Sequence, residues 1–164
     1  KSESQLYMTP EQYKHFLIHG FNAYVKDYVR DEYTSIRYFD NLVHLYLGNP
    51  TEQCGMCGHC THQFVAEGNG NIYPCDFYCT DEWLLGNINE PSENFDTLAH
   101  CEKAIEFLRE SLAVSDECKK CRYFGLCRGG GCKRTREDRN YCESYKAFFD
   151  ACLPLFRAFI AEKK

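Results

Sequence analysis

The chain has 164 residues, of which 44% are hydrophobic and 26% are charged, and its formal net charge is -5. These values are typical of one folded domain, and they exclude disordered and fibrous proteins. The unusual feature is the count of 12 cysteines. Such a count indicates disulfides in a secreted protein and metal binding in a reducing compartment.

Neither a signal peptide nor a membrane span is visible. The N-terminal residues KSESQLYMTP lack an apolar stretch. No window approaches the roughly eighteen consecutive apolar residues that a spanning helix needs. We therefore expect a cytoplasmic protein with no membrane partner.

The first 50 residues predict ordinary helix and strand. Thr9-Pro10 supplies an N-cap and a first-turn proline for a helix over about 10–31, which carries an apolar stripe at helical spacing. Alternation predicts a short strand over 35–39. A short helix over 41–47 should then end at the turn residues Gly48-Asn49-Pro50.

The remaining elements surround the cysteines. Residues 64–66 and 72–74 flank an Asn-Gly turn, which predicts a β-hairpin between Cys60 and Cys75. A second amphipathic helix is expected over 95–112, and a loop-rich cysteine segment over 118–142. A terminal helix from Tyr145 to Phe159 should be kinked by Pro154.

The cysteine spacings predict metal centres. They read Cys54-x5-Cys60-x14-Cys75 and Cys118-x2-Cys121-x5-Cys127-x4-Cys132. A Cys-x2-Cys pair places two sulfurs where both can reach one metal, and iron-sulfur clusters are typically held by four thiolates. Cysteines beyond one set therefore imply a second centre. Cys101 and Cys152 lie on apolar faces, and we interpret them as buried core thiols.

The cysteine pattern resembles the SPASM domain, the auxiliary-cluster module of radical S-adenosylmethionine enzymes. Cys60, nine residues, Gly70, four residues and Cys75 match its opening. Cys118, Cys121, Cys127, Cys132 and Cys142 match the remainder, with one extra residue before Cys132. That insertion lies in Arg128-Gly129-Gly130-Gly131, where glycines can absorb it.

The chain is most similar to the anaerobic sulfatase-maturating enzymes. The resemblance lies in the Cys54, Cys60 and Cys75 run, in the string YPCDFY at 73–78 and in the turn LGNI at 85–88. Such enzymes convert a cysteine or serine of a sulfatase into Cα-formylglycine. The resemblance implies one 4Fe-4S cluster on Cys54, Cys60, Cys75 and Cys132, and a second on Cys118, Cys121, Cys127 and Cys142. It also implies that Asp76 is the base that takes a proton from the target side chain.

The resemblance also implies how the domain is built and what it binds. Residues 1–50 would be the end of a radical S-adenosylmethionine barrel, 51–145 the SPASM domain and 146–164 a C-terminal helix. The expected fold is α+β, with a small β-hairpin and cysteine-rich loops around two metal clusters, packed with several helices. The expected partners are a sulfatase polypeptide and the barrel of the same parent chain. The clusters would serve electron transfer and peptide binding.

The chain lacks the Cys-x3-Cys-x2-Cys triplet that such enzymes use to cleave S-adenosylmethionine. Cys75-x3-Cys79 begins one, but position 82 is a glutamate. We therefore expect S-adenosylmethionine to bind only in the barrel, and the chain to be inactive alone.

Four alternatives remain open. A structural zinc module is possible because Cys57, His59, Cys60 and His62 crowd the first site, and zinc could also occupy an isolated fragment. The basic stretch 117–139 could bind nucleic acid, offset a negative cluster, or simply be solvated. A disulfide-rich secreted domain fits the spacings least. Asp76 could also cap a turn instead of acting as a base.

Overall fold

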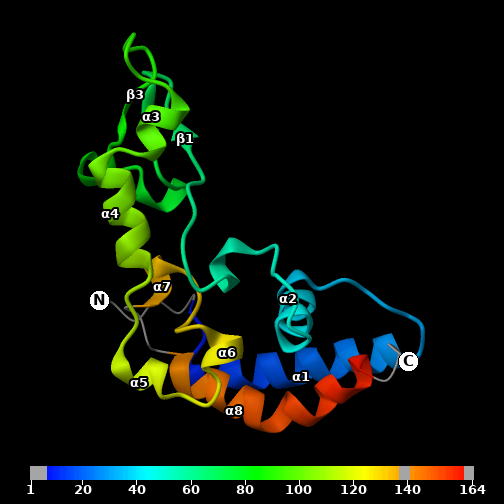
Figure 1. The fold of residues 1–164 in the computed structure, drawn as a ribbon. Helices are drawn as coiled ribbons and strands as arrows, with labels where there is room; N and C mark the ends of the chain where they lie inside the picture. The colour runs from blue at the N-terminus through cyan, green and yellow to red at the C-terminus, as the bar shows by residue number, and fades with distance from the viewer. Residues whose placement is uncertain (1–6, 137–140, 161–164) are drawn as a thin grey trace.

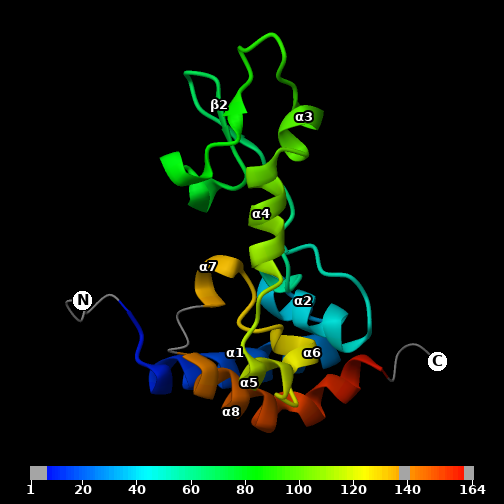
Figure 2. The ribbon, with the colours of Figure 1, turned by 60° about the vertical axis from the view of Figure 1, so that its left-hand side comes forward.

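The chain folds into two parts, seen here in a computed structural model that describes residues 7–136 and 141–160. A lower part is built mainly of helices from both ends of the chain, and an upper part carries a small sheet (Figure 1). The upper part stands upright on the helical base (Figure 2). The predicted α+β class is confirmed.

Two helices distant in sequence form the floor of the lower part. α1 (Pro10–Val29) and α8 (Cys142–Cys152) lie side by side in Figure 1, and the Ser144 hydroxyl donates to the Pro10 carbonyl at 2.6 Å. After α8, the chain tightens into the 3-10 helix η5 (Leu153–Phe159), with Pro154 in its first turn. Where Pro154 was expected to kink the terminal helix, the chain changes from α-helix to 3-10 helix.

The start of α1 is as predicted. The Thr9 side chain accepts from the Gln12 backbone N–H, and the Gln12 side chain accepts from the Thr9 N–H, which forms a capping box. The helix ends at Val29, two residues before the expected end at 31.

Aromatic rings fill the lower core. Phe21 is fully buried, and its ring lies 4.5 to 6.5 Å, centroid to centroid, from five other rings. These rings belong to Tyr24, Phe39, Phe148, Phe156 and Phe159. Aromatic pairs at such distances stabilise a core beyond simple burial, which explains the aromatic excess in the sequence.

The predicted strand over 35–39 is wrong. The chain is extended at Ile36, but α2 (Arg37–Tyr46) begins at the next residue. Phe39, Leu42 and Val43 are buried at helical spacing against α1 and α8. Five alternating residues are too few to outweigh that buried helical face.

The upper part contains the predicted hairpin and one further strand. β1 (Val65–Ala66) pairs with β2 (Asn71–Tyr73), and β2 pairs with β3 (Gly86–Asn87), all antiparallel. The sequence did not predict β3, because two residues cannot show an alternation. Four residues form the buried core beneath this sheet: Ile72, Leu85, Leu98 and Ala104.

The helix expected over 95–112 is two helices. α3 (Phe95–Ala99) ends before an extended Cys101, and α4 (Glu102–Ser111) then runs down toward the base (Figure 1). The break lets Leu98 pack near Gly86 of the sheet while α4 leaves in another direction.

The described part of the predicted cysteine loop contains three short helices. They are α5 (Asp116–Lys119), α6 (Phe124–Cys127) and α7 (Lys133–Arg136). Among the described residues, no helix is long and apolar enough to cross a membrane.

One carboxylate ties α1, α2 and their connection together. Asp40 accepts hydrogen bonds from the hydroxyls of Tyr24 and Tyr33, both at 2.6 Å, and of Ser35, at 2.5 Å. Burial acts to raise the pKa of Asp40, but these three donors outweigh it and the pKa is lowered.

The lowered pKa predicts a loss of stability in acid. Because the folded-state pKa of Asp40 lies below the unfolded value of about 3.9, its contribution is complete above that value and is lost as the pH falls through the folded pKa. Urea unfolding between pH 2 and 7 should show Asp40→Asn to be less stable than wild type at pH 7, with a flatter acid limb. Tyr33→Phe removes one donor, so its stability at pH 7 should lie between those of wild type and Asp40→Asn. Parallel acid limbs for all three proteins would contradict the prediction.

Candidate metal centre

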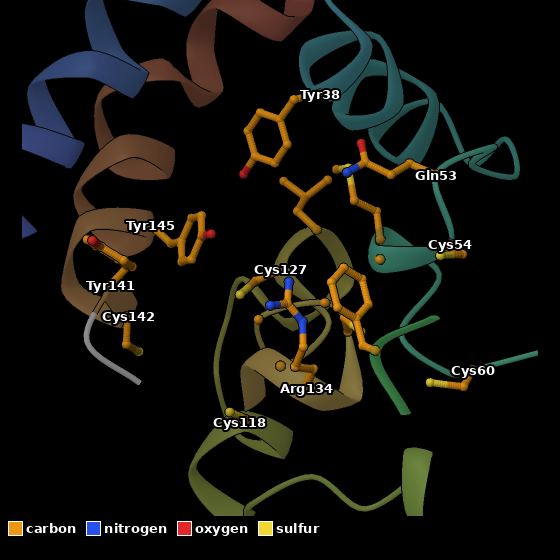
Figure 3. A pocket seen from close by; sticks show the side chains of 18 of the residues that line it. Tyr38, Gln53, Cys54, Cys60, Cys118, Cys127, Arg134, Tyr141, Cys142 and Tyr145 are labelled. Carbon is orange, nitrogen blue, oxygen red and sulfur yellow. The ribbon is translucent and has the colours of Figure 1, made fainter. Parts of the chain in front are cut away.

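A cavity lined by cysteines lies where the two parts of the chain meet. Its volume is about 1020 Å³, and it is bordered by seven of the eight predicted ligands. The eighth, Cys121, borders a smaller adjoining hollow together with Cys118, Cys127 and Cys142. In Figure 3, Cys118, Cys127 and Cys142 lie on one side, and Cys54 and Cys60 lie on the other.

The first group of thiols comes from three separate segments. Cys60 precedes β1, Cys75 follows β2, and Cys132 follows the glycines of the late segment. The Cys60 and Cys132 thiols are hydrogen-bonded to each other, and Cys75 is close enough to Cys132 to interact with it electrostatically. Folding therefore brings together three of the four cysteines of the first predicted set.

Hydrogen bonds to buried polar side chains fix the backbone at Cys60 and just before Cys54. The Cys60 backbone N–H donates to the Ser111 hydroxyl at the end of α4, at 2.9 Å. Asn41, which is 1% exposed, accepts from the backbone N–H groups of Glu52 and Gln53, at 2.9 and 3.1 Å, just before Cys54. The sequence does not predict the Ser111 and Asn41 hydrogen bonds, because no local pattern marks a polar side chain that fixes a distant loop.

The glycine run before Cys132 has a backbone that only glycine adopts easily. Arg128, Gly129, Gly130 and Gly131 all have positive φ angles, between 49° and 90°. A Cβ atom on Gly131 would lie 2.1 Å from the carbonyl oxygen of Gly55. The run therefore brings Cys132 beside the residue that follows Cys54, and it contains the extra residue found in the sequence.

The second group lies within the late segment and α8. Cys118 is in α5, Cys127 ends α6 and Cys142 begins α8, while Cys121 lies between α5 and α6. Cys127 interacts electrostatically with Cys118, Cys121 and Cys142. All four cysteines of the second predicted set are therefore neighbours.

Burial and neighbouring thiols raise the pKa values of three of these cysteines. The hydrogen bond with Cys132, followed by burial, raises the pKa of Cys60. Burial raises the pKa of Cys75 to about 11 and also raises the pKa of Cys127. Each of the three sulfurs also receives a backbone N–H, which lowers its pKa: from Lys133 to Cys60, from Phe77 to Cys75, and from Gly130 to Cys127.

The donor sets suit iron-sulfur clusters. Such clusters bind through four thiolates, and N–H groups directed at the sulfurs tune their potentials. Thiols release their protons when they bind metal, so a bound cation would favour the thiolate forms that burial disfavours here. The second group supplies four neighbouring thiols of this kind, whereas the first supplies three, with the exposed Cys54 also on the cavity wall.

The alternative zinc set does not assemble. The Cys57 thiol contacts the Thr51 hydroxyl at 3.3 Å, and the His62 ring stacks on Phe64 at 5.3 Å. Within residues 7–136 and 141–160, no three His, Cys, Asp or Glu side chains are close enough to hold a single metal ion.

The other cysteines have ordinary surroundings. Cys152 is fully buried in the lower core, as predicted, whereas Cys101 is only partly buried against the upper core. Cys79 donates weakly to the Cys75 carbonyl at 3.7 Å. No disulfide links cysteines in the described parts of the chain.

Cations of the basic stretch make contacts within the chain. Arg128 donates to the Cys57 carbonyl at 2.8 Å, and the Arg134 guanidinium lies 3.8 Å from the centre of the Phe77 ring. Lys119 and Arg122 pair with Asp116 and Asp150. The side chains of residues 135–140 lie outside the described part.

Asp76 borders the cavity but is exposed. It begins the 3-10 helix η2 (Asp76–Tyr78), and its carboxylate accepts a hydrogen bond from the Cys75 thiol at 3.2 Å. Cys75, the N-cap of η2, makes no side-chain cap hydrogen bond.

Comparison with known proteins gives consistent matches. No family profile matches the chain. It is 42% identical over 157 residues to the cysteine-type anaerobic sulfatase-maturating enzyme of Clostridium perfringens (strain 13 / Type A) and 39% identical over 151 residues to that of Clostridium novyi (strain NT). It is 31% identical over 157 residues to the serine-type enzyme of Bacteroides thetaiotaomicron. These matches cover 90%, 87% and 90% of this chain and 41%, 40% and 37% of the relatives, so the chain spans about two fifths of their length.

Solved structures agree with these matches. Native anSMEcpe with bound AdoMet and Cp18Cys peptide superposes with a TM-score of 0.90 at 38% identity, covering 100% of this chain and 47% of that one. The fold and the site together define a cysteine-rich α+β domain. The chain is a homologue of the anaerobic sulfatase-maturating enzymes, so the resemblance seen in the sequence is confirmed.

The glycine run provides a test of the first group. Gly131→Ala should destabilise the protein by more than about 1 kcal/mol, because alanine is strained at positive φ and its Cβ would clash with Gly55. Gly125, within α6, has no atom within 4 Å of its Cβ position. Gly125→Ala should therefore stabilise by about 0.5–1 kcal/mol. Urea denaturation measures both, and equal effects would contradict the assignment of strain to Gly131.

Proposed function

We propose that this chain is the auxiliary-cluster domain of an enzyme that oxidises a cysteine or serine of a sulfatase to Cα-formylglycine. The observation that carries the proposal is the gathering of two groups of cysteines at one cavity. The relatives named above, at up to 42% identity, support the reaction. Identity is higher to the cysteine-type relatives than to the serine-type relative, so a cysteine peptide is the first substrate to test.

The proposed ligands of one cluster are Cys54, Cys60, Cys75 and Cys132, and those of the other are Cys118, Cys121, Cys127 and Cys142. Bound clusters would supply one-electron transfer. The chain contributes by holding the thiols through Ser111, Asn41 and the glycine run, and by directing backbone N–H groups at three sulfurs.

Asp76 is the proposed base. It lies on the cavity wall, where a peptide side chain could reach its carboxylate. When Cys75 binds metal and loses its proton, the hydrogen bond that Asp76 accepts from that thiol is lost. The Asp76 oxygen is then available to accept a proton from the substrate.

The proposal extends to organisation and location. Residues 1–50 would close a radical S-adenosylmethionine barrel, 51–145 would form the SPASM domain, and 146–164 would form a terminal helix. The barrel would supply S-adenosylmethionine chemistry, and a sulfatase polypeptide would bind at the cavity. A reducing cytoplasm would keep the thiols available for iron.

Metal analysis after anaerobic reconstitution tests the cluster assignment. The full-length protein should bind about eight iron atoms through these two sets, in addition to any held by its other segments. Cys75→Ala and Cys127→Ala should each lose about four of them, with matching loss of acid-labile sulfide. Cys101→Ala is the matched control and should lose none. Stoichiometric zinc with no bindable iron-sulfur would rule the proposal out.

The role of Asp76 is tested by substitution in the same protein. Asp76→Asn should lower formylglycine yield by about a hundredfold or more, since a positioned base contributes at least that much. Iron content should be unchanged. Asp81→Asn, in the neighbouring 3-10 helix η3 (Asp81–Trp83), is the control and should remain active. An unaltered yield from Asp76→Asn would remove this residue from the mechanism.

A further inference from the structure

The lysine that follows Cys132 is buried in a cage of aromatic rings. The Lys133 ammonium lies 4.0 Å from the centre of the Trp83 ring, 4.9 Å from that of Tyr78 and 5.1 Å from that of Phe107. It also pairs with Glu110 at 2.6 Å, and its side chain is only 15% exposed. Lysine is rarely this buried without a specific partner, and aromatic faces attract cations.

The cage belongs entirely to the upper part of the chain. Tyr78 is in η2, Trp83 is in η3, and Phe107 and Glu110 are in α4. Lys133 begins α7, which lies beside the lower end of α4 in Figures 1 and 2. One side chain therefore joins the late segment to three elements of the upper part.

The cage is connected to each cysteine of the first group. Lys133 follows Cys132 directly, and its backbone N–H donates to the Cys60 sulfur. The Tyr78 backbone N–H donates to the Cys75 carbonyl at 2.9 Å. Glu110 precedes Ser111, whose hydroxyl accepts from the Cys60 N–H. Lys133 is therefore adjacent to Cys132 and one hydrogen bond from Cys60, and it contacts Tyr78, which lies three residues after Cys75.

Local helix stability does not explain this lysine. Lys133 is the first residue of α7, and cations are favoured at the opposite, C-terminal end of a helix. The Lys133 ammonium instead contacts Tyr78, Trp83 and Phe107, which lie far from it in the sequence, in η2, η3 and α4.

We propose that Lys133 is a positioning residue that aligns Cys132 with Cys60 and Cys75 by anchoring the late segment in the aromatic cage. This inference rests on the proposed function for its purpose, because the three thiols are proposed ligands of one cluster. The alignment itself is a property of the chain without metal, and it can be measured in that state.

The first test uses the metal-free, full-length protein. Diamide takes two electrons and two protons from a pair of close thiols and leaves a disulfide. The Cys60–Cys132 disulfide, quantified by peptide mass spectrometry, should form about tenfold more slowly in Lys133→Met, a change equivalent to about 1.4 kcal/mol. Lys133→Arg keeps the charge and should recover part of the rate. Lys119→Met is the control, because Lys119 is exposed and pairs with Asp116 of its own helix.

The second test uses the reconstituted protein. Lys133→Met should reduce iron and the electron paramagnetic resonance signal of the first set while leaving the second set loaded. Glu110→Gln, which keeps the cage and weakens its ion pair, should show a smaller loss in the same set. An unchanged disulfide rate in Lys133→Met, or equal losses from both sets, would overturn the inference. If the wild-type protein binds no cluster, the proposed function fails, but the disulfide rates still decide the role of Lys133.

Discussion

The buried apolar side chains of this chain form two separate clusters, and cysteines line the cavity between them. One cluster of buried side chains surrounds Phe21 in the helical base, and another surrounds Ile72 beneath the sheet. The cysteine-lined cavity of about 1020 Å³ lies where the parts meet. Apolar burial therefore stabilises each part separately, and cysteine side chains line the junction between them.

The gathered thiols are harder to ionise than ordinary cysteines. Burial and neighbouring sulfurs raise the pKa values of Cys60, Cys75 and Cys127, so the gathered groups resist ionisation when no metal is bound. Backbone N–H donors offset part of this effect at each of the three sulfurs. In the proposed function, a positively charged metal cluster core would compensate the remainder, because cations favour the thiolate form.

Contacts across long sequence separations build the site. The Ser111 hydroxyl holds Cys60 across 51 residues, and the Arg128 guanidinium holds the Cys57 carbonyl across 71. Lys133 extends the same principle through its aromatic cage. The first group of cysteines therefore joins the sheet-bearing part to the late segment, whereas the second lies within the late segment and α8.

Local chemistry was sufficient to predict part of the structure. The Thr9-Pro10 pair marked the start of α1, the Asn-Gly pair marked the hairpin, and the cysteine spacings singled out the thiols that folding gathers. Tertiary packing decided the rest. It turned the alternating segment 35–39 into the start of α2, divided the helix over 95–112 at Cys101, and added the two-residue strand β3. It also placed Ser111, Asn41 and Lys133 behind the cysteines, because contacts between distant residues leave no periodic signal in the sequence.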